Sequence, residues 1–300
     1  MTGVSGLPKT APGDAAPARA GLAWTVRLLD DPRDLLHLLG ADDAAFAWLR
    51  DGAGFVTSGA AVRIPVGAGS TRFHEAAGAV AATLATIRRD DGAVAEALVD
   101  VPAARGPIAV GALPFSSQPG HLVVPALVVG RTPDGRCWSA QVAPSDASAA
   151  IPPCAAPKDD PEPSSFRVEA DPGRAGWERQ VERALAAIEG GGVTKVVLAR
   201  RVLVEADRSF QVSTVLRRLA GAHPSCFSFA SGRFIGASPE LLIRREGLSV
   251  LSQPTAGTVP RGASIVDDDA LVAALVDSPK DAAEHGIVVD AVVDALAHWC

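Results

Sequence analysis

Hydrophobic and polar positions change their spacing halfway along this chain. From residue 24 to residue 150, short apolar runs are separated by glycines and turn residues, a pattern typical of β-strands. The sequence EAAGAVAATLATIR at 75–88 is expected to form a helix. Residues 107–130 are expected to form two strands around a Ser-Gln-Pro-Gly turn. The first half of the chain should therefore be mainly β-structure.

The second half alternates between helical and extended patterns. Apolar residues recur at helical spacing between 177 and 189, and the three glycines at 190–192 then end the helix. The further expected elements are an apolar strand at 193–204, a helix at 212–223, a hairpin at 226–237 with Ser231 and Gly232 at its turn, and two strands within 239–254.

The last helix, expected at 278–300, has a well-marked start. Ser278 can serve as its N-cap, Pro279 fits the first helical position, and Asp281 completes an S-x-x-D capping pattern. The residues expected on its buried face are Ala283, Ile287, Ala291, Val292 and Leu296.

Composition favours a folded chain with one loose end. Of the 300 residues, 48% are hydrophobic and 21% are charged, which is enough apolar surface for a sizeable core. The Ala-, Pro- and Gly-rich residues 1–22 are expected to be a disordered tail, and 23–300 a single domain. A proline- and acid-rich stretch at about 144–172 is expected to be a surface loop.

Charge and cysteine usage exclude several classes of protein. The net charge is −6 and the basic residues form no stripe, which argues against binding nucleic acid. The four cysteines are far apart, so neither a zinc site nor a disulfide framework is expected. No stretch resembles a signal peptide or a membrane span. We expect a cytoplasmic protein that does not bind membranes, and a monomer.

Two residues are candidates for acid–base chemistry. Lys195 opens the apolar strand at 193–204. It can simply face solvent at a strand end, or it can be a partly buried amine that acts as a base, because desolvation disfavours its charged form. Glu240 in FIGASPELL can cap a turn, or it can be a half-buried carboxyl that holds a proton to donate. The residues alone leave both choices open.

Two further segments are candidates for binding. Gly257 and Thr258 lie in QPTAGTVPRG, where a small residue lets the backbone approach a ligand and a hydroxyl can bind it, although an ordinary glycine turn has the same pattern. Asp281 and Glu284 share one face of the last helix and could approach Mg²⁺. Acidic residues at a helix start can equally well complement its dipole.

Four motifs, read in order, resemble those of the chorismate-utilising enzymes: KVVLAR, GASPELL, AGTVPRG and SPKDAAEH. That family comprises isochorismate synthases, salicylate synthases, anthranilate synthase component I and aminodeoxychorismate synthase. The upstream segments FAWLRDGAGFVTSGAA, PIAVGALPF and LVVPALVV follow the family's N-terminal strands, so the resemblance covers nearly everything after residue 22. It implies an α/β (α+β) fold with large, mainly antiparallel β-sheets flanked by helices.

The resemblance also implies a role for each candidate residue. Lys195 matches the base that activates water for attack at C2 of chorismate, where amine-adding members usually have glutamine. Glu240 matches the acid that protonates the departing C4 hydroxyl. Gly257 and Thr258 match a loop that contacts the substrate, and Glu284 matches a ligand of the Mg²⁺ that holds the C1 carboxylate.

The resemblance thus implies a Mg²⁺-dependent isochorismate synthase, an isomerase that acts on the small molecule chorismate and feeds siderophore or menaquinone synthesis. Salicylate synthase, which shares Lys195, Glu240 and Glu284, is the alternative enzyme. A catalytically inactive fragment is the other alternative, since family members continue beyond the last helix, where a second Mg²⁺ glutamate and a carboxylate-binding arginine are expected. Thr255 stands where relatives usually have leucine or isoleucine, which could alter packing near the loop.

Overall fold

The computed structural model of the chain describes residues 21–30, 34–39, 44–90, 97–145 and 162–300. The tail expected at 1–22 lies almost entirely outside the described residues. Contacts divide the chain into two compact units: one built mainly from the residues up to 156 together with 230–234, and one built from 49–52, 157–229 and 235–300. The single domain expected over 23–300 stays a prediction.

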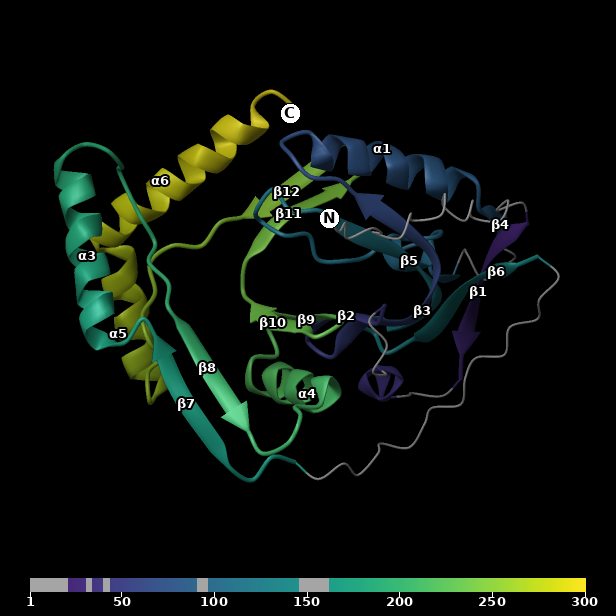
Figure 1. Cartoon of the computed structure of the whole chain (residues 1–300), viewed down its shortest axis with the longest axis horizontal. Coiled ribbons are helices and arrows are strands. Elements are labelled where there is room, and N and C mark those ends of the chain that lie inside the picture. Colours follow the sequence, from purple (N-terminus) through teal and green to yellow (C-terminus); the bar gives the residue numbers. More distant parts are fainter. Residues whose placement is uncertain (1–20, 31–33, 40–43, 91–96, 146–161) are drawn as a thin grey trace, which may run out of the picture. The chain divides into compact units, whose positions relative to one another are not determined.

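Eight strands form one sheet in the order β10-β9-β2-β3-β5-β6-β1-β4 (Figure 1). Its strands are β1 (Leu22–Leu29), β2 (Phe46–Arg50), β3 (Ala53–Val66), β4 (Arg88–Asp90), β5 (Gly120–Arg131), β6 (Cys137–Pro144), β9 (Phe227–Ser231) and β10 (Phe234–Ser238). The β3–β5, β5–β6 and β1–β6 pairs are antiparallel, and β1–β4 is parallel. The large, mainly antiparallel sheet expected from the sequence is confirmed.

The core of the first unit lies on this sheet. Trp24 and Trp138 are each 1% exposed, and Val62, Ile64 and Val124 belong to the same buried cluster. Helix α1 (Arg72–Ala85) confirms the helix expected at 75–88, starting three residues earlier, and its residues Ala79, Val80 and Leu84 pack against that cluster. Short 3₁₀ turns at Leu35–Leu38 and Pro102–Ala104 also belong to this unit.

The expectation of two strands at 107–130 is only half right. β5 provides the second strand, but the first is reduced to a single bridge between Val110 and Val123. The buried guanidinium of Arg72 donates to the carbonyl oxygens of Pro114 at 2.7 Å and Phe115 at 3.1 Å. These carbonyls therefore have partners without forming a ladder, and the segment stays irregular.

The second unit contains four helices and two small sheets among the residues that the structure describes. The helices are α3 (Arg174–Glu189), α4 (Val212–Ala222), α5 (Ile265–Val276) and α6 (Pro279–Leu296). The sheets are β7 (Phe166–Asp171) with β8 (Arg201–Ala206), and β11 (Leu241–Glu246) with β12 (Ser249–Gln253). Three of the four helices, α3, α4 and α6, and the hairpin at Ser231-Gly232 match elements that the sequence predicts. No helix is expected where α5 lies.

Two expectations around β7 are corrected. The loop expected at about 144–172 is interrupted by β7, whose apolar and charged residues alternate and pair with β8; residues 146–161 of it lie outside the described part. The strand expected at 193–204 begins only at Arg201, which pairs with Asp171. The next residue of β7 would be Pro172, which has no N–H to donate, and the chain turns into α3 there. Residues 195–200 therefore precede the ladder.

The buried face expected on the last helix is also wrong. Ser278 caps α6 as predicted, with its hydroxyl accepting from the N–H of Asp281 at 3.3 Å. However, none of the residues of α6 is buried, and Ala283, Ile287 and Ala291 are exposed. Helical spacing identifies which residues share a face, but burial requires another element to cover that face. No helix in the described part of the chain is long and apolar enough to cross a membrane.

Candidate active site

The start of α6 fixes the position of two carboxylates. Because Ser278 is the N-cap and Pro279 the first helical residue, Asp281 lies in the first turn and Glu284 three residues later on the same side. Both side chains are intermediate in exposure. The capping motif in the sequence therefore sets the start of α6 and with it the turn and the side of the helix on which both carboxylates lie.

Lys195 and Glu284 meet although they are far apart in the sequence. The Nζ atom of Lys195 lies 3.1 Å from the Oε1 atom of Glu284, and the two side chains are 19% and 37% exposed. The partial burial that a base would require is thus present at Lys195. The ion pair joins the extended segment before β8 to the second turn of α6, so two of the predicted site residues share one position.

Glu240 lies between β10 and β11, and its side chain is exposed, not half-buried as expected. Its Oε1 atom accepts a hydrogen bond from the backbone N–H of Thr255 at 3.2 Å. The contact comes from the backbone of Thr255, so the polar side chain that departs from the family pattern takes no part in it. This bond ties the carboxylate to the loop that follows β12.

The loop after β12 brings Gly257 against α6. Gly257 has φ +81°, a conformation that side chains rarely adopt, and a Cβ there would lie 3.2 Å from the Cβ of Asp281. The far end of the loop is held by Asp268, which accepts from the N–H of Gly262 at 2.8 Å and pairs with Arg261 at 2.7 Å. The backbone of Gly257 therefore approaches α6 closely, and its expected contact with a ligand stays a prediction. Thr258 is exposed, and its role stays a prediction.

The described residues do not by themselves compose a complete magnesium site. Among them, no three Asp, Glu, His or Cys side chains come together in a way that could hold a metal ion. Glu284, the expected ligand, is occupied by the ammonium of Lys195. A cation that bound Glu284 would compete with this lysine, and we assign no chemical step to a metal.

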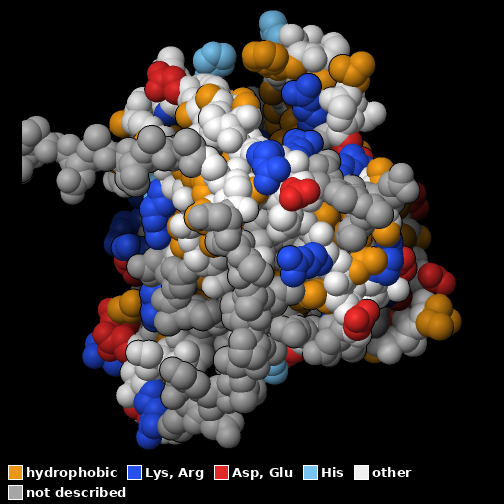
Figure 2. All heavy atoms as spheres, turned by 90° about the vertical axis from the view of Figure 1, so that its right-hand side faces the viewer, with side chains coloured by type: hydrophobic (Ala, Val, Ile, Leu, Met, Phe, Trp, Pro, Cys, Tyr) orange, Lys and Arg blue, Asp and Glu red, His pale blue; other side chains and the backbone are white. Residues whose placement is uncertain are grey.

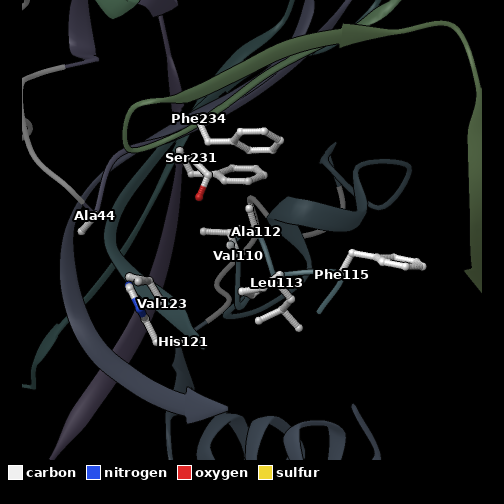
Figure 3. A pocket seen from close by; sticks show the side chains of 12 residues that line it. Ala44, Val110, Ala112, Leu113, Phe115, His121, Val123, Ser231 and Phe234 are labelled. Atoms are coloured by element: carbon white, nitrogen blue, oxygen red, sulfur yellow. The ribbon is translucent and has the colours of Figure 1, made fainter. Parts of the chain in front are cut away.

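A separate hollow of about 600 Å³ lies in the first unit and contains none of the predicted site residues (Figure 3). Phe46, Phe115 and Phe234 line it, together with His121 and Ser231. Its wall is largely apolar and offers no carboxylate or lysine. Acid–base chemistry is therefore better supported at Lys195, Glu240 and Glu284 than in this hollow. Sequence reasoning missed the hollow because its lining comes from separate segments.

The chain belongs to the chorismate-binding enzyme family: the family described as "Chorismate binding enzyme" matches residues 132–300, more than half of the chain. The chain is 34% identical to isochorismate synthase DhbC of Bacillus subtilis over 147 residues (45% of this chain, 37% of the relative). It is 29% identical to isochorismate synthase EntC of Escherichia coli over 198 residues (64% of this chain, 47% of the relative).

Among solved structures, the chain resembles MenF, the menaquinone-specific isochorismate synthase from Escherichia coli, with a TM-score of 0.70 and 22% identity. The match covers 95% of this chain and 66% of that chain. The resemblance to the chorismate-utilising enzymes and the fold class are thus confirmed. The chain spans about half or less of the length of these two curated relatives.

Proposed function

We propose that the chain carries the acid–base residues of an isochorismate synthase, which converts chorismate to isochorismate. The observation that carries the proposal is the ion pair between Lys195 and Glu284, at 3.1 Å, inside the range that matches the family. A lysine at this position fits activation of water better than addition of ammonia, because water needs a base to become a competent nucleophile.

The proposed reaction is an exchange of hydroxyl positions. Lys195, in its neutral amine form, takes a proton from water as the water oxygen bonds to C2 of chorismate. The double bonds shift, the bond between C4 and its hydroxyl breaks, and Glu240 delivers a proton so that water leaves. One water is added and one is lost, which makes the reaction an isomerisation. Gly257 and Thr258 are proposed to contact the substrate.

A requirement for Mg²⁺ is part of the proposal and is supported by Glu284 and by the position of Asp281 on the same helix. When bound, the cation would neutralise carboxylate charge on the substrate, which is useful in a chain of net charge −6. Further ligands are needed beyond those that the described residues bring together. Titration of activity with Mg²⁺ after treatment with EDTA tests this requirement.

The experiment is a product assay with chorismate and Mg²⁺, analysed by chromatography. We expect isochorismate, and we expect Lys195→Met to lower the rate by about 10²–10⁴-fold, the usual contribution of a general base. Lys280→Met is the matched control, since Lys280 is an exposed lysine on α6 and should be dispensable.

Other products separate the alternatives. Fluorescent salicylate would identify a salicylate synthase, and anthranilate formed from ammonia would contradict water addition. Absence of any product from this chain would favour the inactive fragment. MenF is named as menaquinone-specific, and a solved structure of a putative isochorismate synthase from Bacillus anthracis is named as 2,3-dihydroxybenzoate-specific. The proposal covers siderophore and menaquinone synthesis alike. A cytoplasmic monomer stays a prediction.

A further inference from the structure

We propose that the hollow in the first unit is a binding site for a small aromatic carboxylate (Figure 3). Its volume of about 600 Å³ lies within the range typical of small-molecule sites. Every residue that lines it belongs to the first unit, whereas Lys195, Glu240 and Glu284 belong to the second. The hollow and the candidate active site share no residue, so this proposal does not rest on the proposed function.

Three aromatic side chains suit the hollow to a flat ring. Phe46, Phe115 and Phe234 line it, and the last two are 104% and 61% exposed. Phe46 is held in place, because its ring stacks on Phe55 with the centroids 6.1 Å apart and its backbone N–H donates to the buried hydroxyl of Thr57 at 3.1 Å. Aromatic side chains bind a flat ring by offset stacking or edge-to-face contact. An aromatic ligand would therefore meet a wall that is already formed.

The irregular segment that lines the hollow offers hydrogen-bond donors. The guanidinium of Arg72 occupies the carbonyl oxygens of Pro114 and Phe115 at 2.7 Å and 3.1 Å. The backbone N–H groups of Ala112 and Leu113, in contrast, have no hydrogen-bond partner within the described part of the chain. A segment whose acceptors are taken and whose donors remain available suits a ligand group that only accepts, such as a carboxylate.

The surroundings of the hollow are also positively charged. Arg72 is 4% exposed and pairs with no carboxylate among the described residues, so its charge is buried without an anion. None of the described residues that line the hollow is acidic. On the face drawn in Figure 2, by comparison, Lys and Arg side chains are interspersed with acidic ones. A buried cation without a counter-ion favours a negatively charged ligand nearby.

His121 lines the hollow and adds a donor of its own. Its Nε2 atom lies 3.3 Å from the Nη1 atom of the exposed Arg63. Because a guanidinium can only donate, the neutral imidazole accepts at Nε2 and carries its proton on Nδ1, where it can donate to a ligand. Arg63 thus orients the imidazole and adds a second positive charge beside it.

Ser231 supplies a hydroxyl at another part of the wall. Figure 3 shows its oxygen directed towards the space between the labelled side chains. The hydroxyl has no hydrogen-bond partner within the residues that the structure describes. The turn that carries it is anchored, because the N–H of Gly232 donates to the carbonyl oxygen of Ala45 at 2.9 Å. Aromatic walls, donors and positive charge without a carboxylate together define an aromatic acid as the ligand.

The test is isothermal titration calorimetry of the 300-residue chain with 2-naphthoate, a fused aromatic ring with one carboxylate. 2-Naphthamide, which has nearly the same shape but no charge, is the matched probe. We expect one-to-one binding of 2-naphthoate with a Kd below about 1 mM. The amide should bind about tenfold more weakly, since hydrogen bonds to a charged group are the stronger ones.

Variants of the wall test where the carboxylate binds. His121→Ala and Arg63→Met should each raise the Kd for 2-naphthoate about tenfold, because each removes a donor or a charge beside the ligand. His74→Ala and Arg27→Met are the matched controls, since both residues are exposed, belong to the same unit and lie outside the lining of the hollow. They should change the Kd by less than about twofold. Circular dichroism checks that each variant is folded.

Several results would overturn the proposal. Absence of saturable binding up to about 1 mM would remove the site. Equal affinity for the acid and the amide would show that the hollow recognises the ring alone. Unchanged affinity in both His121→Ala and Arg63→Met, or loss of binding in Lys195→Met, would place the probe elsewhere. A dimer of this chain in light scattering that Phe115→Ser dissociates would make a second copy the occupant.

Discussion

Gly130 offers a sharp test of packing in the first unit. It lies opposite Trp138 in the β5–β6 ladder, and a Cβ at this position would lie 2.3 Å from the Cε2 atom and 2.4 Å from the Cζ2 atom of the indole. Its backbone is not in the left-handed region, so alanine is acceptable to the main chain. Gly130→Ala therefore perturbs side-chain packing alone.

The size of the effect follows from the distances. Carbon atoms pack best at about 3.5–4.0 Å, so the methyl group and the indole must separate by roughly 1.2 Å or more. Trp138 is 1% exposed and has no room to move outward. Overpacking of a core costs about 1–3 kcal/mol, and we expect Gly130→Ala to lie near the upper end, at about 3 kcal/mol.

The assay is urea unfolding followed by circular dichroism, with the free energy of unfolding compared at constant m. Gly78→Ala in α1 is the matched control, because a Cβ there meets no atom within 4 Å and the residue is exposed. It should raise the free energy of unfolding by about 1 kcal/mol, since alanine is the better helix former. If Gly130→Ala is as stable as the parent chain, the indole does not lie over Gly130 and the reasoning fails.

Three further predictions concern the second unit. The Ser164 hydroxyl donates to the carboxylate of Asp207 and lowers its pKa below the ordinary 3.8. The ionised carboxylate therefore stabilises the fold above that pH, and this stabilisation is lost as the pH falls through the lowered pKa. Ser164→Ala should lower the free energy of unfolding at neutral pH, and the difference from the parent chain should shrink in unfolding curves measured in acid. Thr255→Pro removes the N–H that binds Glu240 and should reduce isochorismate formation, whereas Thr255→Leu should not; equal rates would contradict this role. Gly257→Ala should cost about 1–2 kcal/mol from its φ of +81° alone, and more because its Cβ would crowd the first turn of α6, as measured by urea unfolding.

Local signals in the sequence predict most of the elements. The start of α6 follows from Ser278 and Pro279, and the β9–β10 hairpin from Ser231 and Gly232, because caps and turns are determined by neighbouring residues. Features that depend on a distant partner are predicted poorly. The strand expected from residue 193 begins only at Arg201, because the ladder with β7 ends at Asp171 and Pro172 follows it.

The candidate site also combines features that the sequence predicts with features that depend on distant parts of the chain. The resemblance to a family places Lys195 and Glu284 in one site, and their ion pair agrees with this. The exposure of Glu240 and the donation from the Thr255 backbone have no local signal, because they depend on how separate strands and loops meet. The periodicity of the sequence could have predicted neither the exposure of Glu240 nor its hydrogen bond with Thr255.

Pro172 has a consequence that extends beyond β7. By ending the ladder at Asp171, it leaves the backbone of residues 195–200 without a strand partner in the described part of the chain. Lys195 lies at the start of this stretch, so its amine is positioned by the ion pair with Glu284 and not by a strand ladder.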